Sequence, residues 1–207
     1  MINRYSEVFD YLSAPKAPTS PEGTVVFGRK DPLVAQRFVD LSGEGLVKWV
    51  VITGGKGKDS GDLDIPESEY LAHEAEKYAS LKDTRLPLAF LETRAENGAE
   101  NANFSLDIMR NENLGHAALT AVAHATSLRR LAHMLDHAAT QREEPLGSVY
   151  RIPSNYSFDA KNPEDQAEAL GEMKRLVEWP QKDWLLPTAG DDIPEDLLYF
   201  YLDSTKK

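Results

Sequence analysis

LETRAENGAENANFSLDIM, residues 91–109, is the stretch that decides the fold. It begins as the end of an apolar strand, passes through a polar loop and then becomes periodic. Ala102, Leu106 and Met109 follow one another at the i, i+4, i+7 spacing that places apolar side chains on one face of a helix. The stretch therefore predicts a strand that runs through a loop into an amphipathic helix.

The first turn of this helix carries more polar side chains than a helix start needs. Asn97, Glu100 and Asn101 are spaced i, i+3, i+4 and so lie on one side. A single Asn would suffice as the N-cap, because it satisfies a backbone N–H that has no partner within the helix. Two interpretations follow: one cap with solvated polar neighbours, or a turn at the mouth of a binding site.

The same alternation of strand and helix repeats along the chain. Apolar, β-rich segments predict strands at residues 24–27, 48–53, 87–92, 117–123 and 148–152, with a helix after each of the first four. Further helices are predicted at 3–13, 163–178 and 194–203. We therefore predict a single-domain α/β fold, a Rossmann-like doubly wound sheet of about five mainly parallel strands with helices on both faces. Residues 1–23 form an N-terminal helix and linker, 24–152 the sheet core, and 153–207 a C-terminal helical extension.

Composition limits the classes of function. The formal net charge of −11 over 207 residues argues against a general nucleic-acid or anionic-membrane surface, since both call for basic stripes. No apolar run approaches the ~20 residues of a membrane span, and the first residues lack the apolar stretch of a signal peptide. The absence of cysteine excludes disulfides and thiolate chemistry. We expect a cytoplasmic protein with a small-molecule partner, and self-association is left open.

Four predicted strand ends are polar and rich in glycine. In open α/β sheets, ligands bind beyond the carboxyl ends of the strands. Glycines let backbone N–H groups approach an anion, and basic side chains neutralise it. The basic residues at these ends include Arg29, Lys30, Lys56, Lys58, Arg129 and Arg130, in a chain with only 23 Lys and Arg against 34 Asp and Glu. This clustering favours a phosphate, carboxylate or nucleotide-like ligand. The loop TGGKGKDSG alone matches neither common phosphate-binding motif, and a flexible surface loop is its alternative interpretation.

Few residues carry a direct signal for catalysis. His124 follows the fourth strand and is either a general acid or base or a hydrogen-bonded structural residue. Ser127 lacks the G-x-S-x-G elbow of a hydrolase. Glu69 and His73 form an i, i+4 pair without a second histidine motif, so no metal site is expected. We expect His133 and His137 to be solvated. We expect Trp179 and Trp184 to cover the edge of the core.

Together these motifs resemble those of the YdcF-like family, a broad group of mostly uncharacterised α/β proteins that includes SanA-like envelope proteins. The similar segments are VVFGRKD, VVITGGKG, ESEYLAHEA, LETRAENGAENANFSLDIM and LTAVAHATSLRRLAHML, over residues 24–135. The fourth segment is close to the family's pattern E-x-x-S-x-N-x-x-E-N. The resemblance places the family's shared polar residues at Gly28, Arg37, Gly54, Gly55, Glu69, Glu92, Asn97, Glu100, Asn101 and Arg130. Members often carry a histidine after a serine or threonine in the loop that follows the fourth strand, where this chain has Ser127.

One member of the family is described as binding S-adenosylmethionine, so the resemblance implies this cofactor, but it implies no particular reaction. Our leading hypothesis is an enzyme of transfer or hydrolysis that acts on a nucleotide-like or phosphorylated small molecule. The alternative is a protein that binds and senses S-adenosylmethionine or a nucleotide without turnover. A purely structural or partner-binding module explains the polar strand ends least well.

Each candidate residue has a role in this hypothesis. Glu69, Glu100 and Asn101 are the catalytic candidates, with either glutamate as general acid or base. Glu92, at a strand end, is placed to accept hydrogen bonds from ribose hydroxyls. The other ligand-binding candidates are the cradle glycines Gly28, Gly54 and Gly55, the basic residues Arg29, Arg37, Lys56, Arg129 and Arg130, and the orienting Asn97.

Overall fold

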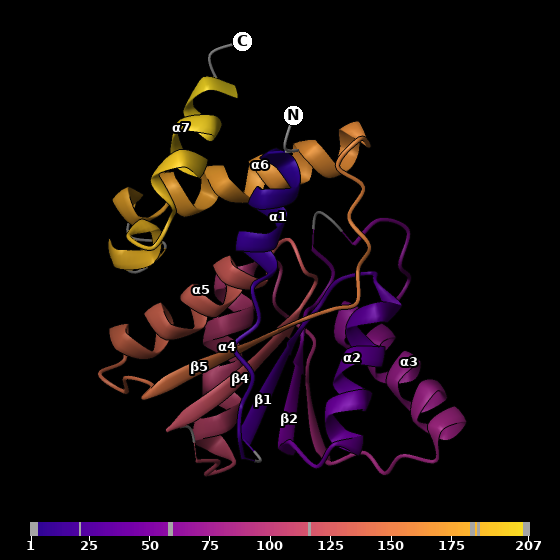
Figure 1. Ribbon diagram of the computed structural model, residues 1–207. Helices are drawn as coiled ribbons and strands as arrows, with labels where there is room; N and C mark the ends of the chain where they lie inside the picture. The colour runs from indigo at the N-terminus through magenta and orange to yellow at the C-terminus, as the bar shows by residue number, and fades with distance from the viewer. Residues whose placement is uncertain are drawn as a thin grey trace.

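A computed structural model of the chain describes residues 4–20, 22–57, 60–115, 117–182, 185 and 187–204. Five strands form one parallel sheet in the order β3-β2-β1-β4-β5 (Figure 1). The strands are β1 (Glu22–Phe27), β2 (Val47–Thr53), β3 (Leu88–Glu92), β4 (Ala118–Ala123) and β5 (Ser148–Pro153). The prediction of a Rossmann-like doubly wound α/β fold is confirmed.

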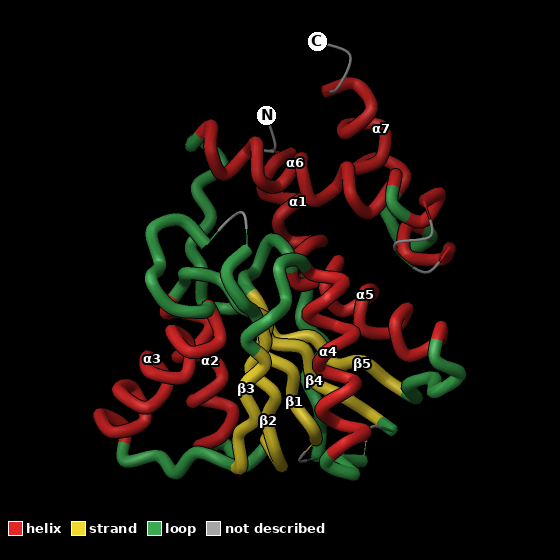
Figure 2. The backbone as a smooth tube through the Cα atoms, turned by 180° about the vertical axis from the view of Figure 1, so that it is seen from behind, coloured by secondary structure: helices red, strands yellow, loops and turns green. Residues whose placement is uncertain are grey.

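Helices cover both faces of the sheet and its carboxyl edge. Figure 2 shows α2 (Pro32–Gly43) and α3 (Glu67–Lys82) on one side, and α4 (Gly98–Asn111) and α5 (Leu128–Gln141) on the other. Beyond the carboxyl ends of the strands lie α1 (Arg4–Ser13), α6 (Pro163–Glu178) and α7 (Glu195–Ser204), at the top of Figure 1. Two short 3₁₀ turns, η1 (Pro180–Lys182) and η2 (Pro187–Gly190), join α6 to α7.

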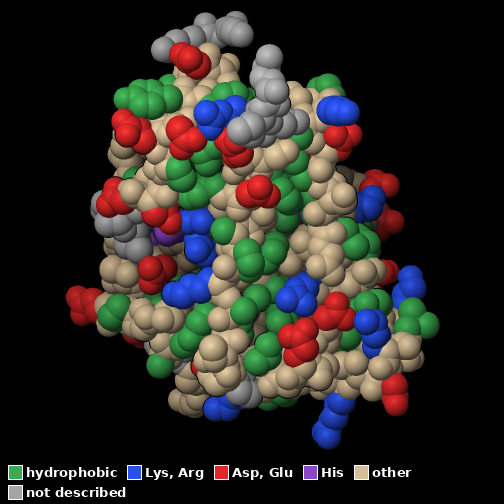
Figure 3. Space-filling view, viewed as in Figure 1, with side chains coloured by type: hydrophobic (Ala, Val, Ile, Leu, Met, Phe, Trp, Pro, Cys, Tyr) green, Lys and Arg blue, Asp and Glu red, His purple; other side chains and the backbone are tan. Residues whose placement is uncertain are grey.

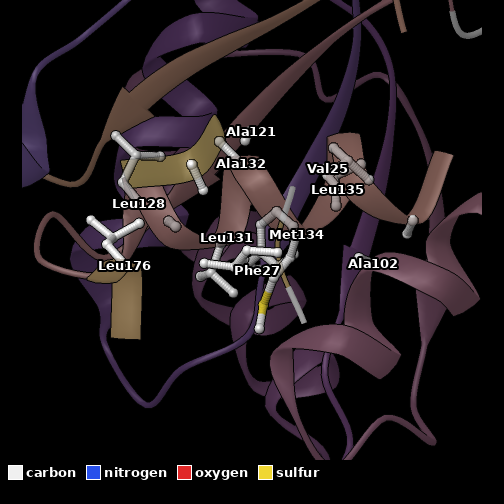
Figure 4. Close-up of a cluster of buried hydrophobic side chains, with 14 of the residues drawn as sticks. Val25, Phe27, Ala102, Ala121, Leu128, Leu131, Ala132, Met134, Leu135 and Leu176 are labelled. Carbon is white, nitrogen blue, oxygen red and sulfur yellow. The ribbon is translucent and has the colours of Figure 1, made fainter. Parts of the chain in front are cut away.

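The sheet has an apolar layer on each face, which is why its strands read as continuous apolar runs. Along β1, Val26 packs toward α2 and α3, whereas Val25 and Phe27 pack toward α4 and α5. Figure 4 shows Phe27 beside Leu131 and Met134 of α5. Both layers are closed over the central strands β1, β2 and β4, whereas the edge strand β3 is mostly exposed. Polar side chains that must meet a ligand are therefore left to the edges of the sheet.

Local signals place the helix starts. The side chain of Asp31 accepts a hydrogen bond from the backbone N–H of Leu33 and caps α2, and Pro32 occupies the first helical position. Asn162 caps α6 in the same way, ahead of Pro163. Within the described residues, no helix is both long enough and apolar enough to cross a bilayer.

The strand order reverses between β1 and β4. The chain moves from β1 to β2 and β3 on one side and then returns to β4 on the other side. The loops that follow β1 and β4 therefore leave the sheet in opposite directions, which is the arrangement that forms a ligand crevice in open α/β sheets. Helix α6 lies above this point (Figure 1).

Candidate functional site

The loops after β1 and β4 meet α6 in a continuous chain of polar contacts, here called the switch-point site. Arg29 donates two hydrogen bonds to the carboxylate of Glu168, at 2.7 and 3.3 Å. The hydroxyl of Thr126 donates to Glu168 Oε1 at 2.6 Å, and Nδ1 of His124 lies 2.8 Å from Thr126 Oγ1. The other ring nitrogen, Nε2, lies 3.7 Å from Oδ2 of Asp31. The site thus joins residues from three distant parts of the chain.

These contacts decide the tautomer of His124. An ionised carboxylate only accepts hydrogen bonds, so Thr126 spends its one hydroxyl hydrogen on Glu168. Nδ1 of His124 must then donate to Thr126, which leaves Nε2 of the neutral ring as an acceptor. Oδ2 of Asp31 is also an acceptor, and it is buried with no hydrogen-bond partner among the described residues. Two acceptors therefore face each other across 3.7 Å, and a group with two hydrogens to donate, such as water, would satisfy both.

The electrostatics keep this ring neutral. Burial lowers the pKa of His124, and the nearby charge of Arg29 lowers it further, against the opposing effects of Glu168 and Asp31. Burial acts to raise the pKa of Glu168, but hydrogen bonds from Arg29 and Thr126 outweigh it and hold that pKa below its usual value. At neutral pH the site therefore contains an ionised Glu168 and an unprotonated Nε2.

The wall of the site comes from the segment after β5. The ring of Tyr156 lies 4.4 Å from the ring of His124, centroid to centroid, and its hydroxyl donates to Asp165 at 2.7 Å. Burial, followed by the hydrogen bond to Asp165, raises the pKa of Tyr156 to about 12. Ser154 donates its backbone N–H to the carbonyl of Ala123, and its buried hydroxyl has no partner in the described chain.

Most of the basic residues predicted at the strand ends contact acidic side chains of the chain itself. Arg130 binds Glu172 of α6 at 2.6 and 3.1 Å, and Arg129 binds Asp192 at 2.5 Å. Lys30 contacts Asp62, and Lys56 contacts the backbone carbonyl of Asp64. Lys58 lies outside the described residues. In Figure 3, Lys and Arg side chains lie among Asp and Glu side chains and form no continuous basic patch on this face. An anionic ligand would therefore have to compete with internal carboxylates.

The three predicted cradle glycines lie together, and their closest neighbours belong to the chain itself. A Cβ on Gly28 would lie 2.6 Å from the carbonyl oxygen of Thr53 and 2.8 Å from Oε2 of Glu67. A Cβ on Gly55 would lie 2.6 Å from the carbonyl oxygen of Thr93, and Gly54 has a φ of +135° that favours glycine. These glycines let the loops after β1, β2 and β3 pack against one another.

The acidic residue that packs against these glycines is Glu67. Its Oε1 accepts a hydrogen bond from Ser60 at 2.9 Å, and its side chain is buried beside Gly28 and Gly54. Glu69, the predicted catalytic candidate, is half-buried in the first turn of α3, two residues after Glu67. A catalytic role for Glu69 stays a prediction.

Residues predicted around the third strand end hold the local structure together. Glu92 is buried and accepts hydrogen bonds from the backbone N–H groups of Arg94 and Ala95 and from the hydroxyl of Thr53. Asn101 is also buried, with its side-chain oxygen 3.2 Å from Thr53 Oγ1. These contacts tie the end of β2 to the end of β3 and to α4.

Asn97 and Glu100 form a reciprocal cap at the start of α4. The side-chain oxygen of Asn97 accepts from the backbone N–H of Glu100 at 3.0 Å, while the carboxylate of Glu100 accepts from the backbone N–H of Glu96 at 2.8 Å. Asn97 is exposed. This geometry fits the interpretation of a helix cap.

Three further expectations have mixed outcomes. Arg37 lies in the middle of α2, and its guanidinium is 3.7 Å from the carboxylate of Glu44, which follows the end of that helix. The expectation that His133 and His137 are solvated holds only in part, because both residues are partly exposed but one ring nitrogen of each is buried. Trp179 stacks near Arg130, 5.4 Å from guanidinium to ring centroid, and Trp184 lies outside the described residues.

Comparison with known proteins adds no assignment: no protein-family model and no curated protein matches the chain. The resemblance to the YdcF-like family therefore stays a prediction. Among the described residues, no group of three or more His, Asp and Glu side chains is arranged to hold a metal ion.

Glu168 is the functional residue that sequence reasoning missed. Its only local signal is the i, i+4 spacing with Glu172, which places two acids on one face of α6. Asp31 follows the first predicted strand but was given no role, because an Asp before a Pro is an ordinary helix cap. The meeting of Glu168 with His124 depends on how α6 lies over the sheet, and that of Asp31 on the adjacent positions of β1 and β4.

Proposed function

We propose that the chain is an enzyme of transfer or hydrolysis that binds a nucleotide-like or phosphorylated small molecule at the switch-point site, with His124 as its general base. The observation that carries the proposal is the pair of facing acceptors, Nε2 of His124 and the unpartnered Oδ2 of Asp31, 3.7 Å apart. A water molecule placed between them would donate one hydrogen to each, so that Asp31 orients it while Nε2 of His124 holds the proton that is removed.

The chemistry then follows from these groups. Nε2 of His124 takes the proton of the bound O–H, the oxygen forms the new bond to the electrophilic atom, and the leaving group departs with the bonding electrons. The resulting imidazolium would be stabilised by Asp31 on one side and by Glu168, 3.6 Å from Nδ1, on the other. Arg29 is the cation best placed to bind an anionic group of the substrate, in exchange for Glu168.

A non-catalytic protein that senses S-adenosylmethionine or a nucleotide is the second candidate. The observation that favours it is the same unpartnered carboxylate oxygen of Asp31, which could accept a ribose hydroxyl without any reaction. The resemblance to the YdcF-like family supports S-adenosylmethionine as the compound to test first.

A thermal-shift screen against S-adenosylmethionine, mono- and dinucleotides and sugar phosphates tests the binding proposal. A ligand at about 100 times its Kd stabilises the fold by ~2.7 kcal/mol, a rise in Tm of roughly 5–10 °C for a chain of this size. The rise should shrink in Asp31→Asn, which keeps an N-cap but replaces an acceptor, and should persist in the control His73→Gln, an exposed histidine of α3.

Turnover separates the two candidates. An enzyme predicts that His124→Gln loses activity on the ligand found in the screen while its affinity stays within a few-fold. A sensor predicts no turnover by the unmodified chain, with ligand-dependent stabilisation intact. The switch-point site is not the binding site if no compound stabilises the chain. The same conclusion follows if the rise in Tm is as large in Asp31→Asn as in the unmodified chain and in the control His73→Gln.

A further inference from the structure

A second polar site lies beside β5 and is lined by none of the residues of the switch-point site. It is a hollow of about 290 Å³ between the N-terminal linker, α5 and the start of β5. Its polar lining consists of Lys16, His133, Asp136, Ser148 and Arg151. The linker is held here by two backbone hydrogen bonds between Lys16 and Arg151, at 2.9 and 2.8 Å. We call this hollow the Arg151 site.

Arg151 is a cation that forms no ion pair within the described residues. Its side chain makes no hydrogen bond or ion pair with the described residues, and its Nε atom is buried. Burial lowers the pKa of Arg151, and the neighbouring charge of Arg129 lowers it further. Since buried donors in native proteins nearly always have a partner, a guanidinium in this state calls for an acceptor that the chain does not supply.

The nearest acid is already engaged. One carboxylate oxygen of Asp192 accepts from Arg129 at 2.5 Å, and the other accepts from the hydroxyl of Tyr11 at 2.7 Å. The guanidinium of Arg129 also stacks on the ring of Tyr11, 3.9 Å from its centroid. This cluster fixes Asp192 toward Arg129, so its charge only partly offsets that of Arg151.

Two more groups make the hollow suited to an anion. Lys16 is exposed on the rim, with its ammonium 5.6 Å from the centroid of the Tyr150 ring. Nε2 of His133 is buried and lacks a partner in the described chain. Asp136 is the one acidic side chain in the lining, and burial raises its pKa. Lys16 and Arg151 against Asp136 leave the lining with an excess of positive charge in a protein whose net charge is −11.

We propose that the Arg151 site binds a small oxyanion, the phosphate or carboxylate group of a small molecule, with Arg151 as its main ligand and Lys16 closing the rim. The guanidinium of Arg151 would bind two oxygens of such a group side by side, the geometry that arginine favours with phosphate and carboxylate. This inference does not depend on the switch-point site.

The test is a titration with sodium phosphate, with sodium acetate and with sodium chloride at matched ionic strength, read by Tm and by the NMR signals of the histidine rings. We expect phosphate or acetate to raise Tm in a saturable way and to move the ring signals of His133, while those of exposed His73 stay in place. Which anion saturates at the lower concentration identifies the phosphate or the carboxylate.

Variants make the test specific. Arg151→Gln should abolish the saturable response, and Lys16→Gln, an exposed change that should leave the fold intact, should weaken it several-fold. Arg110→Gln is the control, because Arg110 pairs with Glu144 at 2.7 Å outside this hollow. The proposal is overturned if neither anion acts beyond chloride, or if Lys16→Gln and Arg151→Gln respond as the unmodified chain does.

Discussion

Replacing Glu92 by Ala tests whether this residue is a structural acceptor at the centre of the loop packing. The Glu92 side chain is 1% exposed and accepts hydrogen bonds from the backbone N–H groups of Arg94 and Ala95 and from Thr53 Oγ1, at 2.7, 3.2 and 3.0 Å. A hydrogen bond to a charged acceptor is worth roughly 1.5–3 kcal/mol, and an abandoned buried donor costs a comparable amount. Water that enters the vacated space can bind the abandoned donors and so makes the loss smaller than the sum of three such bonds. We therefore expect a decrease of about 3–4 kcal/mol in the free energy of unfolding.

Urea unfolding at neutral pH measures this loss directly, and the corresponding drop in Tm is roughly 6–16 °C for a chain of this size. Glu92→Gln keeps the volume and one acceptor oxygen, so it should cost about half as much. Glu96→Gln, an exposed change in the same loop, is the control and should stay within about 0.5 kcal/mol. A loss below about 1 kcal/mol in Glu92→Ala would refute the structural role and return Glu92 to the list of ligand-binding candidates.

Other predictions concern the glycines, a helix cap and pH. Gly28→Ala should destabilise the fold by more than about 2 kcal/mol in urea unfolding, because its Cβ would lie 2.6 Å from a backbone oxygen, whereas Gly115→Ala, with open space around it, should be nearly neutral. Asn97→Ala should cost about 1 kcal/mol by loss of the cap of α4, and no measurable loss would contradict the cap. His133 has a pKa lowered to about 4, mainly by burial, so the unfolded chain binds its proton first as pH falls below about 6.5. This group should therefore remove about 2 kcal/mol of stability between pH 7.5 and 5. His133→Gln should flatten that dependence, and an unchanged slope would contradict the burial of this ring.

The fold was predictable because its signals are local. The apolar runs that became β1, β2 and β4 are buried on both faces, and helix starts such as Asp31-Pro32 and Asn162-Pro163 carry their own caps. Asn97 and Glu100 also carried a local signal, since an Asn followed three residues later by a Glu is a capping pattern. The interpretation as a plain helix cap accounts for both residues.

The site was less predictable because its partners are distant in sequence. Arg29 is separated from Glu168 by 139 residues, and Arg130 from Glu172 by 42. Nothing near either arginine reveals that α6 lies over the carboxyl edge and brings these acids to them. The burial of His133 has the same origin, because it depends on the N-terminal linker that packs beside β5. Clustering of basic residues at strand ends thus predicted their location correctly but not their internal partners.

The most direct test of the central claim is the affinity of Glu168→Gln for an anionic ligand found in the screen, measured by calorimetry at low salt. If the ligand binds Arg29 in exchange for Glu168, removing this competing carboxylate should tighten binding. The ion pair is partly exposed, with side chains 40% and 26% accessible, so its worth is about 0.5–1 kcal/mol and the expected gain is roughly two- to five-fold. Glu164→Gln, an exposed change on the same helix, should leave the affinity unchanged. Unchanged or weaker binding in Glu168→Gln, with the fold intact, would contradict the switch-point site as the place where the ligand's anion binds.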